Sequence, residues 1–113
     1  MDIYKLNDLI TETRESGTAF HEFLRVDPLS CGMYVLPAGG VDDQTPHHED
    51  EIYVVHRGRG KFVVAGRQHD VGPGDVIFVA AEDEHRFFDI TEDLELLVVF
   101  APAYSGRRTG PDG

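Results

Sequence analysis

The sequence predicts an all-β fold: a single β-barrel preceded by one short helix. The chain has 113 residues, which is enough for one hydrophobic core and too few for two. From Ala19 onward, short runs rich in β-branched and aromatic residues alternate with Gly, Pro and Asp, a spacing typical of antiparallel sandwiches and barrels. Because so many short runs follow one another through tight turns, we expect a closed or nearly closed architecture.

The helix is expected near the N-terminus. Leu6, Leu9 and Ile10 have the i, i+3, i+4 spacing of an amphipathic helix, polar residues follow them, and Gly17 is a typical stop. We therefore assign residues 1–17 to an N-terminal helical segment.

The strands are expected in residues 18–104, which we assign to the barrel. The runs with strand character are Phe20–Val26, Gly32–Leu36, Glu51–His56, Lys61–Ala65, Val76–Val79, His85–Ile90 and Leu94–Phe100. Residues 58–60 and 66–67 have the composition of hairpin turns, and residues 72–75 that of a proline-containing turn. Residues 105–113 contain almost nothing to bury, so we predict a mobile C-terminal tail.

Charge and cysteine content exclude several classes of partner. The chain has 21 Asp and Glu against 10 Lys and Arg, so a nucleic acid or an anionic membrane surface would be repelled. Cys31 is the single cysteine, which rules out an internal disulfide and is typical of a reducing compartment. No apolar run reaches the roughly 18 residues needed to span a bilayer. We expect a cytoplasmic protein that binds neither nucleic acid nor membrane.

The histidines indicate a metal site. His47 lies beside the acidic triplet 49–51, and His85 follows the acidic triplet 82–84. Imidazole and carboxylate together suit Fe, Mn, Ni, Co or Zn, so we predict one divalent ion of this group. In a straight strand the α-carbons of His47 and Glu51 would be about 13 Å apart, too far for two ligands of one ion. We therefore expect the chain to bend between them, near residues 49–50.

Two spaced motifs resemble those of the cupin superfamily. In the first, Gly39, five residues, Thr45-Pro46-His47, three residues, Glu51, six residues and Gly58 are similar to the first cupin motif. In the second, Gly74, five residues, Ala80-Ala81-Glu82, two residues, His85, three residues and Asp89 are similar to the second motif. The resemblance implies a small single-domain cupin barrel, or jelly roll.

The resemblance also implies ligands. His47, Glu51 and His85 match ligand positions of the two motifs, whereas Thr45 stands where the family usually has another histidine. Thr is a poor ligand for a transition metal, so the site either has three protein ligands with water or uses Gln44 as a fourth ligand.

The leading functional hypothesis is a mononuclear metal enzyme that acts on a small molecule. Two His and one carboxylate favour dioxygenase-type oxidation, with isomerase or lyase chemistry next. Glu51 is a candidate general base, and Tyr53 a candidate catalytic contact, although both Tyr53 and Tyr34 also suit core packing. The alternatives are a barrel that binds a ligand or metal without turnover, and metal-free chemistry at His47 or His85. By analogy with small cupins we expect a homodimer, formed through the run Phe20–Val26.

Overall fold

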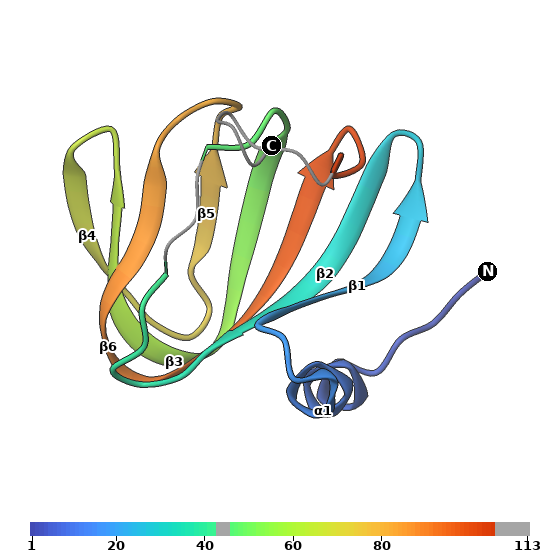
Figure 1. Ribbon diagram of the computed structural model, residues 1–113, viewed down its shortest axis with the longest axis horizontal. Coiled ribbons are helices and arrows are strands. Elements are labelled where there is room, and N and C mark those ends of the chain that lie inside the picture. Colours follow the sequence, from blue (N-terminus) through green and yellow to red (C-terminus); the bar gives the residue numbers. More distant parts are fainter. Residues whose placement is uncertain (43–45, 106–113) are drawn as a thin grey trace.

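The computed structural model describes residues 1–42 and 46–105, which contain one helix and six strands (Figure 1). The elements are α1 (Leu6–Ser16), β1 (Phe20–Val26), β2 (Leu29–Leu36), β3 (Asp50–Val64), β4 (Arg67–Val71), β5 (Val76–Val79) and β6 (His85–Ala101). The predicted all-β barrel with one short helix is confirmed.

The strands form an antiparallel sheet in the order β1-β2-β6-β3-β4, with β5 pairing with the first part of β3. The long strands β3 and β6 pair along almost their whole length, from Asp50 opposite Ala101 to Val64 opposite His85. Both strands curve strongly part-way along, so the sheet folds back on itself (Figure 1). The two halves of the β3–β6 ladder thereby enclose the interior of the barrel.

The helix packs on the outside of the sheet beside β1 and β2 (Figure 1). Leu9 and Ile10 pack against Met33 of β2, and Leu97 of β6 lies against the same cluster. The helix ends at Gly17, which has a φ of 77°, a left-handed conformation that glycine adopts without strain. The predicted amphipathic pattern and its stop are both confirmed.

The prediction of a hairpin turn at residues 58–60 is wrong, because these residues lie inside β3. The register between β3 and β6 shifts three times between Val55 and Lys61, which marks bulges that bend the strand without reversing it. Gly58 has a φ of 100°, and a β-carbon there would collide with the backbone of β6. The glycines therefore serve a bend and a close backbone approach rather than a turn. The two runs predicted as residues 51–56 and 61–65 therefore form one continuous strand, β3. The two runs predicted as residues 85–90 and 94–100 likewise form one continuous strand, β6.

The remaining strand predictions agree in part with the structure. The limits of β1 and β5 are as predicted, and β2 begins three residues earlier than expected. Strand β4 was not predicted, because Arg67–Asp70 is a run of exposed polar residues with no alternation. It forms because Ala65 and Gly66, with φ of 50° and 78°, make a tight hairpin turn after β3. The predicted tail falls mostly at residues 106–113, outside the described residues, so the tail and the domain limits stay predictions.

The main core fills the interior of the barrel. It consists of side chains that point inward from the two halves of the ladder and from β2, β4 and β5. Its buried members are Leu36, Tyr53, Val55, Phe62, Val71, Val79, Phe87, Ile90, Leu94, Leu96, Val98 and Phe100. Among the described residues, no helix has the length and apolar character needed to cross a membrane.

Candidate metal centre

Three candidate ligands from separate parts of the chain meet inside the barrel. Glu51 is the second residue of β3 and lies opposite Val79 and Phe100, whereas His85 is the first residue of β6 and lies opposite Val64. Glu51 and His85 thus come from opposite halves of the folded ladder. His47 lies in the segment before β3.

A bend brings His47 back toward Glu51. The chain bends at His48 and Glu49, immediately before β3, close to the predicted position. The backbone N–H of Glu82 donates to the carbonyl of His47 at 2.7 Å, and the N–H of Ala81 donates to the Asp50 carboxylate at 2.8 Å. These hydrogen bonds tie the bend to the turn before β6. The same contacts therefore place His47 near His85.

The three side chains form one compact cluster. An Oε1 atom of Glu51 lies 3.0 Å from Nε2 of His85 and 3.4 Å from Nδ1 of His47. The ligand atoms of all three residues lie within 4.8 Å of one another, and each residue is at most 6% exposed. Two donors bonded to one ion at about 2.1 Å, and separated by 90–110°, would lie about 3.0–3.4 Å apart. The donor separations therefore fit a single ion.

The hydrogen bonding within the cluster is incomplete. Nδ1 of His47, Nε2 of His85 and both oxygens of Glu51 are buried and have no hydrogen-bond partner among residues 1–42 and 46–105. Buried polar atoms are rarely left in this state, since each costs about 1–3 kcal/mol. Two imidazole nitrogens and a carboxylate that converge without partners are a donor set suited to a divalent transition metal.

A backbone carbonyl fixes the orientation of the His85 ring. Nδ1 of His85 lies 2.8 Å from the carbonyl oxygen of Asp83, which can only accept. Nδ1 therefore carries a proton, so Nε2 is the ring nitrogen that faces Glu51 and that can bind a metal when it is unprotonated. A hydrogen bond from the other ring nitrogen to a carbonyl is the usual support of a metal-binding histidine.

The electrostatics favour a charged pair when no metal is present. Burial works to raise the pKa of Glu51, but contacts with His47 and His85 outweigh it and hold the pKa below its ordinary value of 4.5. Burial works to lower the pKa of His85, but the Glu51 carboxylate, the Asp83 carbonyl and Asp42 together raise it above 6.5.

The metal-free protein should therefore be more stable near pH about 5.5 than near pH about 8.5. The raised pKa of His85 gives stability that is complete below 6.5 and is lost as pH rises through the folded-state pKa. The lowered pKa of Glu51 gives stability that persists above 4.5 and is lost only as pH falls through its folded-state value. Urea unfolding in chelator at both pH values measures the difference. The variant His85→Gln cannot gain this proton and should show a smaller loss; an equal loss in both proteins would contradict the prediction.

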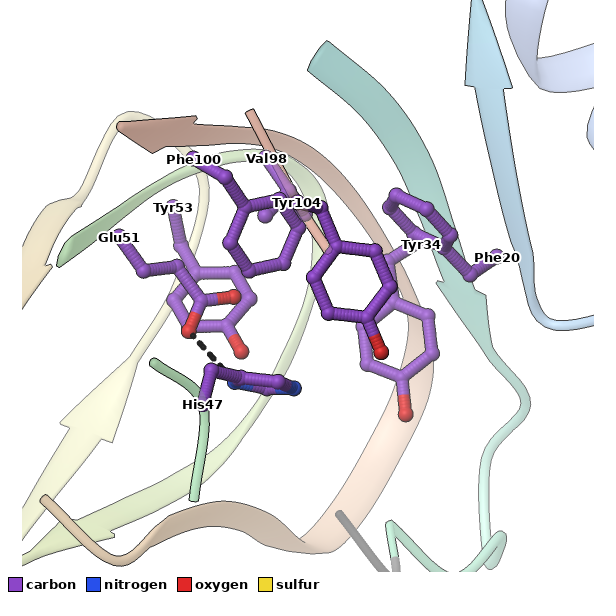
Figure 2. Close-up of a pocket in the computed structure, with 8 residues that line it drawn as sticks. All are labelled: Phe20, Tyr34, His47, Glu51, Tyr53, Val98, Phe100 and Tyr104. Carbon is purple, nitrogen blue, oxygen red and sulfur yellow. Dashed lines mark ion pairs between the residues drawn. The ribbon is translucent and has the colours of Figure 1, made fainter. Parts of the chain in front are cut away.

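Two members of the cluster, His47 and Glu51, line an aromatic pocket with a cavity of about 120 Å³ (Figure 2). The lining residues are Phe20, Tyr34, His47, Glu51, Tyr53, Val98, Phe100 and Tyr104. In Figure 2 the hydroxyl of Tyr53 points toward the Glu51 carboxylate and the His47 ring. Tyr34 and Tyr53, named from the sequence as candidate contacts, both face this pocket. None of the described lining residues is Lys or Arg, so the walls offer no fixed cation.

Sequence reasoning missed a buried carboxylate behind the pocket. Asp42 is 3% exposed and accepts hydrogen bonds from the Tyr34 hydroxyl at 2.6 Å and from the Phe87 backbone N–H at 2.8 Å. It therefore fixes Tyr34 against β6. Asp42 follows Val41 and precedes a second Asp, a context that carries no sequence signal of this role, because its partners are 8 and 45 residues away.

Two other expectations about the site have different outcomes. Gln44, the predicted fourth ligand, and Thr45 lie outside the described residues, so the role of Gln44 stays a prediction. Regular strand alternation predicts that Asp89 shares a face with His85 and Phe87, and this prediction is wrong. Asp89 has a φ of 46°, which breaks the alternation, so Asp89 is exposed and Ile90 takes the inward position.

Comparison with known proteins agrees with this architecture. The model of the cupin domain family matches residues 32–100, well over half of the chain. The chain belongs to the cupin family. The match includes His47, Glu51 and His85, and the two motifs that resembled the family from sequence fall entirely within it.

This cupin has similar proteins in several bacteria. It is 40% identical over 105 residues to an uncharacterized protein of Streptomyces coelicolor, a match that covers 93% of this chain and 100% of the relative. The crystal structure of TT1209 from Thermus thermophilus has a TM-score of 0.73 at 21% identity, covering 91% of this cupin and 99% of that chain. The DMSP lyase DddQ from Ruegeria pomeroyi has a TM-score of 0.69 at 22% identity, and the match covers 88% of this cupin and 56% of the DddQ chain. The two structural likenesses concern the fold alone.

Proposed function

We propose that this cupin is a mononuclear metal-dependent enzyme that acts on a small molecule, with dioxygenase-type oxidation as the leading reaction. The observation that carries the proposal is the buried cluster of His47, Glu51 and His85, whose unpartnered atoms converge and of which His47 and Glu51 also line the aromatic pocket. Two His and one carboxylate are the ligand set of many non-haem iron oxygenases.

The chemistry of the site is divided between ion and protein. A divalent ion held by the three residues would supply Lewis acidity and, if it is iron, electrons for the reduction of dioxygen. The protein holds the ligands in place through the Asp83 carbonyl and the bend before β3. Its aromatic walls keep bulk water from the reacting groups. Glu51 and the Tyr53 hydroxyl are the proposed catalytic groups, since both can hold or move a proton beside the cluster.

The size of the pocket limits the substrate. A cavity of about 120 Å³ is comparable to the engineered 150 Å³ cavity that binds benzene. The substrate is therefore expected to have about six to eight non-hydrogen atoms in the pocket, a mostly apolar body, and oxygen atoms at the end that faces His47 and Glu51.

A second candidate reaction is elimination or isomerisation with the metal as Lewis acid. The Tyr53 hydroxyl favours it, because a phenol beside a carboxylate is suited to proton transfer. The structural neighbour DddQ is a DMSP lyase, and its activity, which is a property of that protein, is in keeping with this candidate.

The first test is the metal content of protein purified without chelator and with oxygen excluded. We expect close to one ion of Fe, Mn, Ni, Co or Zn per chain, and its loss in His85→Ala. Iron would favour oxidation, and zinc would favour Lewis-acid chemistry. If neither protein holds metal after reconstitution, the metal-enzyme proposal is wrong.

A second test separates an enzyme from a barrel that only stores a metal or ligand. An enzyme needs an exchangeable coordination position, whereas a storage site is closed by protein ligands such as Gln44. Azide added to the Co²⁺-loaded protein should therefore change its visible absorption spectrum. An unchanged spectrum that becomes azide-sensitive in Gln44→Ala would support the closed storage site instead.

We further propose a cytoplasmic homodimer. The single cysteine supports a reducing compartment. Strand β1 stands at one end of the strand order, so it is available for pairing with a second copy. Ile52 and Phe78, which are paired across β3 and β5, and the nearby Val76 are exposed apolar residues that a partner could also cover. A monomeric mass by light scattering across a concentration series would contradict the dimer.

A further inference from the structure

The segment after β6 is held beside the pocket by hydrogen bonds to two separate regions, the β1–β2 hairpin and the bend before β3. The backbone N–H of Tyr104 donates to the Ser30 hydroxyl at 2.8 Å, and that of Ala103 donates to the Asp27 carbonyl at 3.2 Å. Arg25 donates to the carbonyl of Tyr104. On the other side, the N–H of Ser105 donates to Glu49 at 3.1 Å.

Two of the acceptors in this network are buried. Ser30 is 1% exposed and Glu49 is 3% exposed, so neither hydrogen bond competes directly with bulk water. Glu49 lies in the bend that positions His47. The segment is thus connected both to the β1–β2 turn and to the bend beside the proposed metal centre.

These hydrogen bonds fix the position of the Tyr104 side chain. Its ring stacks on Phe100 with centroids 4.7 Å apart and an interplanar angle of 24°. It also lies 5.5 Å from the His47 ring and 6.2 Å from the Phe20 ring, both in edge-to-face contact. Figure 2 shows the Tyr104 ring beside Phe100, among the side chains that surround the pocket. The Tyr104 ring therefore occupies space beside Phe100, Phe20 and His47 into which the pocket would otherwise extend.

We propose that Tyr104 is a specificity-determining residue that sets the length of the ligand this pocket accepts. With the ring in place, the pocket accepts one ring or an apolar body of similar size. Without the ring, the pocket extends along Phe100 and Phe20 and accepts a body of two fused rings. This inference deepens the proposed function, because it concerns the substrate of the same site, but it depends on the shape of the pocket and not on the metal.

Phenol and 2-naphthol are suitable probes, because they share one hydroxyl and differ by one ring. Their dissociation constants would be measured by calorimetry for the wild type and for Tyr104→Ala, each in metal-free and Co²⁺-loaded form. The wild type should prefer phenol by about tenfold or more, since a second ring would collide with Tyr104. Tyr104→Ala should reverse this preference, with 2-naphthol binding about tenfold more tightly than it does to the wild type.

Three variants make the test specific. Tyr104→Phe keeps the ring and should retain the wild-type preference. Tyr4→Ala removes a tyrosine that packs on Phe23 outside the pocket, and it should also leave the preference unchanged. Tyr104→Leu supplies the measurement if the alanine variant does not fold, and it should shift the preference in the same direction.

The outcomes separate this inference from the proposed function. A preference for phenol that is unchanged in both Tyr104→Ala and Tyr104→Leu would overturn the role of Tyr104, whether or not the protein binds metal. A reversed preference in the metal-free protein would support it even if Co²⁺ did not bind, in which case the proposed metal enzyme alone would be wrong.

Discussion

Adding the correct metal to the metal-free protein should raise its melting temperature by roughly 10 °C when free metal is about 100 times its Kd. At that ratio, binding to the folded state alone contributes about 2.7 kcal/mol. In a domain of this size, each kcal/mol corresponds to about 4 °C. The stabilisation arises because the unfolded chain does not hold His47, Glu51 and His85 together, whereas the folded chain places them within 4.8 Å of one another.

Glu51→Gln should remove most of this shift, because a neutral amide replaces the anionic ligand that contacts both histidines. Glu84→Gln is the matched control, since Glu84 is an exposed carboxylate directly before His85. The control also reports on unspecific binding to a chain with a net charge of −11. Scanning calorimetry with and without metal measures the shifts. Equal shifts in Glu51→Gln and Glu84→Gln would show that the ion binds elsewhere.

Replacing Gly58 with Ala should destabilise the fold by about 3 kcal/mol or more. Gly58 has a φ of 100°, and an added β-carbon would collide with the Asp93 carbonyl and come within 2.7 Å of the Leu94 α-carbon. Both contacts are with backbone, so no side chain can move aside. The substitution would force β3 and β6 apart where both strands bend.

Gly66→Ala is the control for the backbone conformation alone. Gly66 has a similar φ of 78°, but a β-carbon there meets nothing within 4 Å. Its cost should be limited to conformational strain of about 1 kcal/mol. Free energies of unfolding in urea measure both variants. If the two glycines prove equally costly to replace, the close approach at Gly58 does not carry the effect.

The sequence was sufficient to predict the fold class and the cluster of candidate ligands for separate physical reasons. Alternation and turn residues report local structure, so α1, β1 and β5 could be placed closely. The spacing of His47, Glu51 and His85 predicts one shared site because it matches two motifs of the family. Those motifs place the segment with His47 and Glu51 and the segment with His85 in the same site. Glycine, however, serves a turn, a bulge or a close approach equally well. The glycines at residues 58 and 60 therefore led to the wrong prediction of a turn, because the sequence does not show that β6 lies close to them.

The walls of the pocket were harder to predict than its ligands. Tyr104 is held at the site by a hydrogen bond from its own N–H to Ser30 and by one from the N–H of Ser105 to Glu49, which join residues 74 and 56 positions apart in the chain. Asp42 likewise acts through tertiary partners. No periodicity or motif marks such residues, because their positions depend on how the ends of the strands come together. Phe20 has the pattern of an ordinary core residue and differs from one only by its position beside a cavity.

The long β3–β6 ladder has a consequence for the dynamics of the protein. Glu51 lies near the beginning of β3, and His85 begins β6 opposite Val64 at the far end of β3. Glu51 and His85 are therefore attached to opposite ends of the same set of backbone hydrogen bonds. The site can open fully only if part of that ladder separates, so local unfolding at the centre and global unfolding become one cooperative event. An ion that bridges Glu51 and His85 would slow amide hydrogen exchange along the entire ladder, including amides remote from the site.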